Sequence, residues 1–291
     1  MNSTQIRSCN AVLTTLFTLE WEFVVDFFNS LNNQTHKDFE VLVVNDGFDK
    51  LDLIRDSYKD LNILEIEGVD CIAFNRQLLI NTAKKYYDNA IFCDSDDFFS
   101  ENRIELSIYL LNDYDVVVND VDLYVNERVV NSSYFSQDLS NRAEITIDDI
   151  IEKNYFGLSN TAVKLSSIDN IEFDYSLKAV DWFFFSNLLI KERKAIFTNE
   201  AKTFYRQHSD NIAGIGVGTY DQIIKELDVK RLHYQLMSKI NSNFESYLKS
   251  LNEFIAQAPI EPECNKAWQS TIEKSNAWWS LINLNLKWWK Q

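Results

Sequence analysis

The sequence predicts an α/β fold built on a mixed, mainly parallel sheet that is flanked by helices. Near-continuous apolar runs such as Phe39–Val44 and Ile91–Cys93 are typical of strands buried on both faces of a parallel sheet. These runs alternate with segments whose apolar residues recur at helical spacing, as Trp21, Val25 and Phe28 do. This β-α-β-α rhythm implies right-handed crossovers between parallel strands.

The elements follow in order from the same patterns. We expect strands at 9–15, 39–45, 61–66, 89–93, 115–119, 121–125 and 195–205, and helices at 20–33, 49–58, 72–86, 101–111, 177–191 and 220–256. Polar loops are expected at 126–145 and at 212–218, and Thr146 fits a helix N-cap. The long helical pattern after the second loop divides the chain into a domain over residues 1–218 and a mainly helical, tryptophan-rich appendage over residues 219–291.

The composition narrows the class of protein. A formal charge of −16 over 291 residues argues against a nucleic-acid binder, whose affinity depends on Lys and Arg. The four cysteines are far apart and only three histidines are present, which disfavours a zinc site. Reduced thiols, no recognisable signal peptide and no apolar span long enough to cross a bilayer predict a cytoplasmic protein.

An apolar strand ends abruptly in three carboxylates within the four residues Asp94-Ser95-Asp96-Asp97. In an open α/β sheet, ligands bind just beyond the carboxyl ends of the strands. The side chains of Asp94 and Asp96 lie on the same side of an extended chain, and each raises the pKa of the other unless a cation lies between them. Hard divalent cations bind carboxylates together with substrate phosphates. The pattern therefore favours a metal site for a phosphate-bearing ligand over a solvated acidic turn.

Four motifs, in a fixed order, resemble family 2 glycosyltransferases. The segment Ser30–Gly47 is similar to the family's S-x-x-N-Q-T-x-x-x-F-E followed by an apolar run and D-D-G-S. Asp94–Asp97 matches its D-x-D-D, Val180–Trp182 resembles E-D-W, and Arg206–His208 resembles R-x-H. The ordered set covers roughly the first two-thirds of the chain and is more specific than any single motif. The resemblance implies a GT-A (Rossmann-like) fold, a nucleotide-sugar donor, a Mn²⁺ or Mg²⁺ ion and inversion at the anomeric carbon.

The resemblance also implies roles for individual positions. Nucleotide-sugar contacts are implied for Thr15, Phe17, Asp46, Asn75, Arg76, Asp94 and Ser95, with Asp46 at the uracil edge and Asp94 at the ribose. Asp96 would bind the metal, and His208 would approach the metal or the diphosphate. The chain departs from the family pattern at Asn45, Phe48 and Val180. Simpler alternatives are a turn former at Asp46, a surface cation at Arg76 and a core histidine at His208.

Asp181 is the expected general base. Val180 replaces the Glu of E-D-W, so a single carboxylate remains there to take the proton from an acceptor hydroxyl. Asp97 and Trp182 are further candidates on the acceptor side, with Trp182 as a surface on which a sugar stacks. The alternative for Asp181 is an N-cap of the helix that follows it.

These features together predict an inverting glycosyltransferase. It would move a sugar from a UDP-sugar to a hydroxyl of a glycan or lipid-linked glycan in bacterial surface polysaccharide synthesis. Two other classes stay open: a haloacid-dehalogenase-type phosphohydrolase and a non-catalytic module that binds nucleotide sugars. Phe98 stands where such phosphohydrolases usually carry Thr or Val, and the acidic strand follows three others, although in those enzymes it usually comes first.

Five of the seven tryptophans lie in residues 267–289. Tryptophan is enriched at membrane interfaces and at partner surfaces, so this segment is a candidate for peripheral contact with the inner face of the membrane. The alternative is that the rings pack onto the core. Little positive charge accompanies the rings, which favours packing.

Overall fold

The computed structural model describes residues 8–170, 172–208, 220–257 and 277–282. Its first half is a run of parallel strands with helical crossovers, as the apolar rhythm predicts. The strands β1 (Asn10–Phe17), β2 (Glu40–Asp46), β3 (Asn62–Glu67) and β4 (Asn89–Phe92) lie in the order β3-β2-β1-β4. The helices here are α1 (Trp21–Asn32), α2 (Leu51–Ser57), α3 (Ile72–Ala83) and α4 (Arg103–Leu110).

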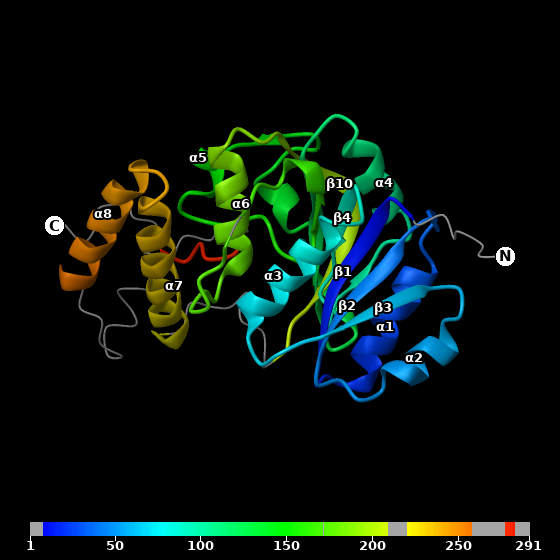
Figure 1. The fold of residues 1–291 in the computed structure, drawn as a ribbon. Coiled ribbons are helices and arrows are strands. Elements are labelled where there is room, and N and C mark those ends of the chain that lie inside the picture. The colour runs from blue at the N-terminus through cyan, green and yellow to red at the C-terminus, as the bar shows by residue number, and fades with distance from the viewer. Residues whose placement is uncertain (1–7, 171, 209–219, 258–276, 283–291) are drawn as a thin grey trace.

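The second half of the sheet makes it mixed. Strand β9 (Thr161–Lys164) is antiparallel to both β4 and β6 (Val116–Val125), and β10 (Ala195–Arg206) is parallel to β6. Short antiparallel strands complete the edge: β5 (Phe98–Phe99), β7 (Arg128–Asn131) and β8 (Glu144–Ile145). Helices α5 (Ile147–Ile150) and α6 (Val180–Ile190) lie in the connections. The predicted fold class, a mixed and mainly parallel sheet flanked by helices, is confirmed (Figure 1).

The sheet separates two apolar clusters because successive side chains of a strand point to opposite faces. Leu13 of β1 packs in the cluster that contains α3 and α6, whereas its neighbour Val12 packs with α1, α2 and α4. Burial on both faces explains why the strands read as continuous apolar runs rather than as alternating ones. In β2 the polar residues therefore lie at the two ends of the strand.

The C-terminal helical pattern forms two helices, α7 (Tyr220–Ser238) and α8 (Asn243–Gln257), and not the single helix expected over 220–256. The break is a turn in which Asn241 Oδ1 accepts the backbone N–H of Asn243 over 2.9 Å, a turn role that Asn commonly takes. Buried residues of both helices, such as Tyr234 and Phe244, belong to the same apolar cluster as α6. None of the helices in the described ranges is long and apolar enough to cross a membrane.

Other differences from the expected elements are local. The two strands expected at 115–119 and 121–125 form one continuous strand, β6, and the expected loop at 126–145 contains β7 and β8. Strand β9 was not expected. The expected loop at 212–218 and the proposed division after residue 218 lie outside the described residues.

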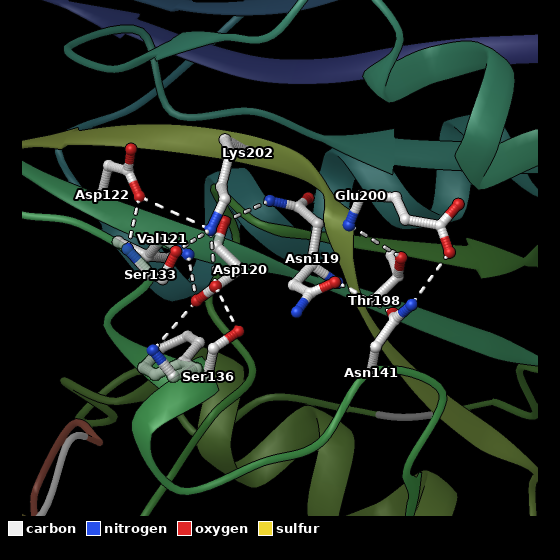
Figure 2. Close-up of polar contacts among 12 residues, drawn as sticks. Asn119, Asp120, Val121, Asp122, Ser133, Ser136, Asn141, Thr198, Glu200 and Lys202 are labelled. Atoms are coloured by element: carbon white, nitrogen blue, oxygen red, sulfur yellow. Dashed lines mark hydrogen bonds and ion pairs between the residues drawn. The ribbon is translucent and has the colours of Figure 1, made fainter.

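A buried ion pair fixes the turn that follows β7. The register of β10 shifts between Thr198 and Lys202, which pairs Lys202 with Asp120 of β6. Lys202 Nζ lies 2.6 Å from Asp120 Oδ2, and the Asp120 side chain is fully buried (Figure 2). The Asp120 carboxylate also accepts hydrogen bonds from Val121 N, Phe135 N and Ser136 Oγ. These bonds satisfy the buried carboxylate and hold the Phe135 turn against the sheet.

Candidate active site

A cavity of about 450 Å³ lies at the carboxyl ends of β1, β2 and β4, the edge at which open α/β sheets bind ligands. The predicted nucleotide-sugar and metal residues that line it are Thr15, Phe17, Asp46, Asn75, Arg76, Asp94, Asp96 and His208. Asp181 lines the same cavity. The fold thus brings together side chains that are up to about 190 residues apart in the sequence.

Asp46 and Asn75 form a linked pair at the ends of β2 and α3. Asn75 Nδ2 donates to Asp46 Oδ2 over 2.9 Å and to the Val69 carbonyl, and Asn75 Oδ1 accepts the Val69 N–H. Burial and the nearby Asp70 raise the pKa of Asp46, although the bond from Asn75 acts in the opposite direction. With its side-chain bonds made inside the protein, Asn75 orients Asp46 and the loop at Val69.

Arg76 and Asp94 form an ion pair in the cavity wall. Burial raises the pKa of Asp94, the Arg76 guanidinium lowers it, and the Asp96 charge raises it again. Arg76 Nη1 is buried and has no hydrogen-bond partner among the described residues, and neither has Thr15 Oγ1. Unpaired buried donors of this kind suit an anionic, hydrogen-bonding ligand.

Asp96 and His208 are the residues that suit a metal ion. Asp96 Oδ2 lies 2.9 Å from His208 Nε2, and each side chain is 15% exposed at the cavity wall. Within the described part of the chain no group of three or more His, Cys, Asp or Glu side chains is arranged to hold a metal. One carboxylate and one imidazole fit an ion that completes its coordination with phosphate oxygens and water.

Contacts with β10 and α1 hold the loop that carries Asp96 in place. Arg206 donates from Nε to the Asp96 carbonyl over 2.9 Å and from its backbone N–H to Asp97 Oδ1 over 2.8 Å. Its Nη2 lies 2.7 Å from Asp26 Oδ2, and its guanidinium lies over the Phe23 ring. Arg206 therefore fixes the position of the loop that carries Asp96.

Ser95 and Asp97 do not line the cavity. The Ser95 hydroxyl is buried and donates to the Thr15 carbonyl over 2.8 Å, which ties the acidic loop to the end of β1. Asp97 is also fully buried, where it accepts bonds from Ser159 and Arg206, and burial raises its pKa well above the usual value. The expectations that Ser95 contacts the nucleotide sugar and that Asp97 faces the acceptor are wrong. Residues 94–97 form a turn, closed by the bond from Asp97 N to the Asp94 carbonyl, and both side chains are buried beneath it.

Asp181 lies in the first turn of α6, where the helix begins at Val180 and the N-cap position is Ala179. Asp181 is therefore not the N-cap of this helix. Burial is the main reason that the pKa of Asp181 is raised to about 7, and the Asp94 charge adds to the effect. A carboxylate with a pKa close to physiological pH is suited to accept a proton.

Trp182 is not available to an acceptor. Its ring is fully buried and stacks on the imidazole of His233 in α7, with 4.1 Å between the ring centroids. Its Nε1 donates to the Ile150 carbonyl over 2.7 Å. The reason is that residues 182–189 of α6 are all buried, so Trp182 points into the core, whereas Asp181 before it lines the cavity.

Several cavity residues have no signal in the sequence motifs. They are Ile72, Lys178, Tyr205, Trp278 and Trp279, together with the loop at 157–159. Trp278 and Trp279 belong to the tryptophan-rich C-terminal segment, and they are only 5% and 9% exposed. Both rings pack in the apolar cluster and also line the cavity, so their burial favours packing over membrane contact. Trp268, Trp288 and Trp289 lie outside the described residues.

Sequence comparisons identify relatives that transfer sugars. The model of the family described as Glycosyl transferase family 2 matches residues 14–163. The UDP-Glc:alpha-D-GlcNAc-diphosphoundecaprenol beta-1,3-glucosyltransferase WfaP of Escherichia coli is 26% identical over 201 residues, which make up 68% of this chain and 76% of that protein.

Solved structures share the fold at low identity. TarS 1–349 of S. aureus, in complex with UDP-GlcNAc, matches with a TM-score of 0.63 and 17% identity over 89% of this chain and 78% of that chain. The mannosyltransferase PcManGT of Pyrobaculum calidifontis, in complex with GDP-Man and Mn²⁺, matches with a TM-score of 0.57 and 12% identity over 93% and 82% of the two chains. These likenesses establish the GT-A fold, and the family match spans more than half of the sequence. The chain belongs to glycosyl transferase family 2.

Proposed function

We propose that the protein is an inverting, metal-dependent glycosyltransferase that moves a sugar from a UDP-sugar to a hydroxyl of a lipid-linked glycan. The observation that carries this proposal is the presence of two different carboxylate sites in one cavity. Asp96 is paired with His208 at the end of β4, whereas Asp181 stands apart in α6 with a pKa of about 7. Leaving-group stabilisation and proton abstraction need two such separate carboxylates.

The donor would occupy the part of the cavity formed by β1, β2 and α3. Asn75 holds Oδ2 of Asp46, so Oδ1 can accept the imide N–H of uracil. Thr15 and Phe17 would contact the base, Asp94 the ribose, and Arg76 Nη1 the diphosphate.

Asp96 and His208 would hold a Mn²⁺ or Mg²⁺ ion, which supplies charge stabilisation to the leaving diphosphate when it is bound. Arg206 holds the backbone of Asp96 in place for this task. Ser95 and Asp97 brace the same loop from inside the protein.

Asp181 would take the proton of the acceptor hydroxyl as that oxygen attacks the anomeric carbon. The C–O bond to the diphosphate breaks as the new C–O bond forms, and attack opposite the leaving group inverts the configuration. Burial keeps the Asp181 carboxylate basic enough to accept the proton near neutral pH.

Similarity to WfaP favours glucose as the donated sugar and an N-acetylglucosaminyl diphospholipid as the acceptor. Such an acceptor supports a role in bacterial surface polysaccharide synthesis, in the cytoplasm at the inner face of the membrane. We also propose that residues 219–291 are a mainly helical addition to a catalytic domain of residues 1–218. Membrane contact through the tryptophans outside the described residues stays a prediction.

The test is UDP binding and sugar transfer in the wild type and in Asp96→Ala. We expect UDP-glucose to raise the Tm with Mn²⁺ but much less with EDTA, and Asp96→Ala to lose the metal-dependent part of the UDP affinity. Asp113→Ala removes the same charge at an exposed position away from the cavity and serves as the control.

Unchanged UDP affinity in Asp96→Ala would contradict the assignment. Binding of the donor without transfer or donor hydrolysis would favour the non-catalytic module. Family membership and fold already favour a glycosyltransferase over a phosphohydrolase.

A further inference from the structure

Residues 277–282, here called the C-terminal segment, return to the cavity from the far end of the chain. Figure 1 shows the segment in red, running from α7 towards α6. Its Trp278 and Trp279 line the cavity together with Asp181 and Tyr205. The sequence motifs of the family end well before this segment, so nothing in them accounts for it.

A buried ion pair in α7 holds the C-terminal segment. Glu226 and Lys230 are 2% and 0% exposed, and their charged atoms lie 3.2 Å apart. The Glu226 carboxylate accepts the N–H groups of Leu281 and Ile282, and Lys230 Nζ donates to the Ile282 carbonyl over 2.6 Å. A buried ion pair is costly to desolvate, and here its further hydrogen bonds fix the C-terminal segment, apart from one that Lys230 Nζ donates to the Glu152 carbonyl over 2.6 Å.

Asn154 holds the other end of the segment. Its backbone N–H donates to the Trp278 carbonyl and its carbonyl accepts the Trp278 N–H, each over 2.9 Å. Its side-chain amide donates to Asp181 Oδ2 over 3.2 Å. The segment is thereby joined directly to the residue that holds the candidate base.

The two indoles have different surroundings. The Trp278 ring packs edge-on against Phe135 and Tyr205, with centroid distances of 4.9 and 5.7 Å, and a Cβ on Gly157 would approach it to 2.8 Å. The Asp120 network of Figure 2 holds the Phe135 backbone in this position. Trp279 lines the cavity with 9% of the residue exposed, and none of the ring contacts among the described residues involves it. Its backbone has a φ of 58°, in the left-handed region. Such a conformation in a bulky residue persists only where the surroundings impose it.

We propose that the Trp279 indole is a stacking platform for a sugar ring of the acceptor, with Trp278 as its packed support. This inference rests on the proposed function and assigns the acceptor side of the same cavity. The donor residues lie on β1, β2, β4 and α3, whereas Trp279 belongs to the segment that is joined to the base. The base must lie beside the acceptor hydroxyl, and a flat apolar ring face is the usual surface for the C–H face of a pyranose.

The test compares Trp279→Ala with the wild type, using UDP-glucose, Mn²⁺ and N-acetylglucosaminyl diphosphate that carries a short alkyl chain. We expect the KM for this acceptor to rise by about tenfold or more, while UDP affinity by calorimetry and slow donor hydrolysis by water are kept. Trp279→Phe should keep most of the acceptor affinity, and Trp279→Leu, which is apolar but not planar, should not. Trp21→Ala, on the first turn of α1, is the matched control and should leave the acceptor KM unchanged.

Three other outcomes would count against the proposal. An unchanged acceptor KM in Trp279→Ala and Trp279→Leu would overturn it. Equal losses of Tm, UDP affinity and acceptor affinity that Phe does not rescue would show that Trp279 only packs. A wild-type protein that binds UDP but forms no product with this acceptor would overturn the proposed acceptor and its platform together.

Discussion

The side-chain amide of Asn154 donates to Oδ2 of Asp181 over 3.2 Å, while the backbone of the same residue pairs with Trp278 in both directions. Asn154 is fully buried, and its Oδ1 also accepts the Phe156 N–H, so its side chain has one defined orientation. A hydrogen bond to an ionised carboxylate favours that form and lowers its pKa. We therefore expect the Asn154 bond to act against burial in the same direction as the backbone N–H groups of Asp181 and Trp182, which lower the pKa of Asp181.

Removing this bond is expected to change the pH dependence of catalysis. In Asn154→Ala the pKa of Asp181 should rise further, so the acid limb of the kcat/KM profile should move to higher pH and turnover at neutral pH should fall several-fold. UDP affinity should not change. Asn187→Ala removes another buried asparagine, one whose amide donates to the Phe183 carbonyl inside α6, and is the control for lost packing. An acid limb that moves equally in both variants, or in neither, would contradict the role of Asn154 in orienting Asp181 and setting its pKa.

Asp181→Asn tests the base itself. The amide has nearly the same shape but cannot take a proton, so we expect transfer to fall by about a hundredfold or more while UDP and metal binding stay normal. If Asp181 is the base, kcat/KM of the wild type should rise with pH through about 7, because only a deprotonated carboxylate can accept the proton. The assay is initial-rate kinetics between pH 5 and 9. Near-normal turnover in the variant would mean that another group accepts the proton.

The same substitution should stabilise the protein at alkaline pH. The pKa of Asp181 is raised from 3.8 to about 7 in the folded state, so folding favours the protonated form. That contribution is fully present below the unfolded pKa and is lost as the pH rises through about 7. Asp181→Asn is uncharged at every pH and avoids the loss, so its Tm should exceed that of the wild type by a few degrees at pH 8.5 but not at pH 4. Parallel Tm curves over this range would show that burial does not perturb Asp181.

The donor side offers a test of base recognition. In Asp46→Ala the acceptor for the uracil imide N–H is lost and Asn75 Nδ2 loses its partner, so UDP affinity should fall and discrimination against other nucleoside diphosphates should narrow. Asp70→Ala removes a nearby cavity carboxylate without that bond and is the control. Calorimetry with UDP, GDP and ADP gives the measurement. An equal loss for all three would indicate damage to the turn at Gly47 instead.

The sequence predicted well which of the proposed donor residues line one cavity, and it predicted poorly which way Asp97 and Trp182 face. Asp46 ends β2, and Asp94 and Asp96 lie in the turn after β4, so the sequence pattern alone places them at the edge of the sheet. The predictions for Trp182 and Asp97 were wrong because the orientation of Trp182 depends on the packing of α7 on α6, and that of Asp97 on the turn after β4 and its bond from Arg206. The position of Trp278 in the cavity wall could not be predicted from local sequence patterns, because it depends on contacts between segments more than a hundred residues apart.

We expect the buried Glu226–Lys230 pair to contribute more to the free energy of unfolding than an exposed ion pair on the same helix does. In Lys230→Met the Glu226 carboxylate stays buried without its cation, and the Ile282 carbonyl loses its donor. Breaking a buried pair in this way costs about 3–5 kcal/mol of unfolding free energy. Arg231→Met provides the comparison, because Arg231 pairs with Asp228 on the same helix but both side chains are about half exposed.

An exposed pair of that kind contributes about 0–1 kcal/mol, so the control should be nearly neutral in urea unfolding. The double variant Glu226→Gln/Lys230→Met should lose less than the sum of the two single variants, because it leaves no unpaired buried charge. Its UDP affinity should remain, since the donor residues lie on other elements, but acceptor turnover should fall as the C-terminal segment loses its attachment. Losses in Lys230→Met no larger than those in Arg231→Met would mean that other contacts hold Trp278 and Trp279 at the cavity.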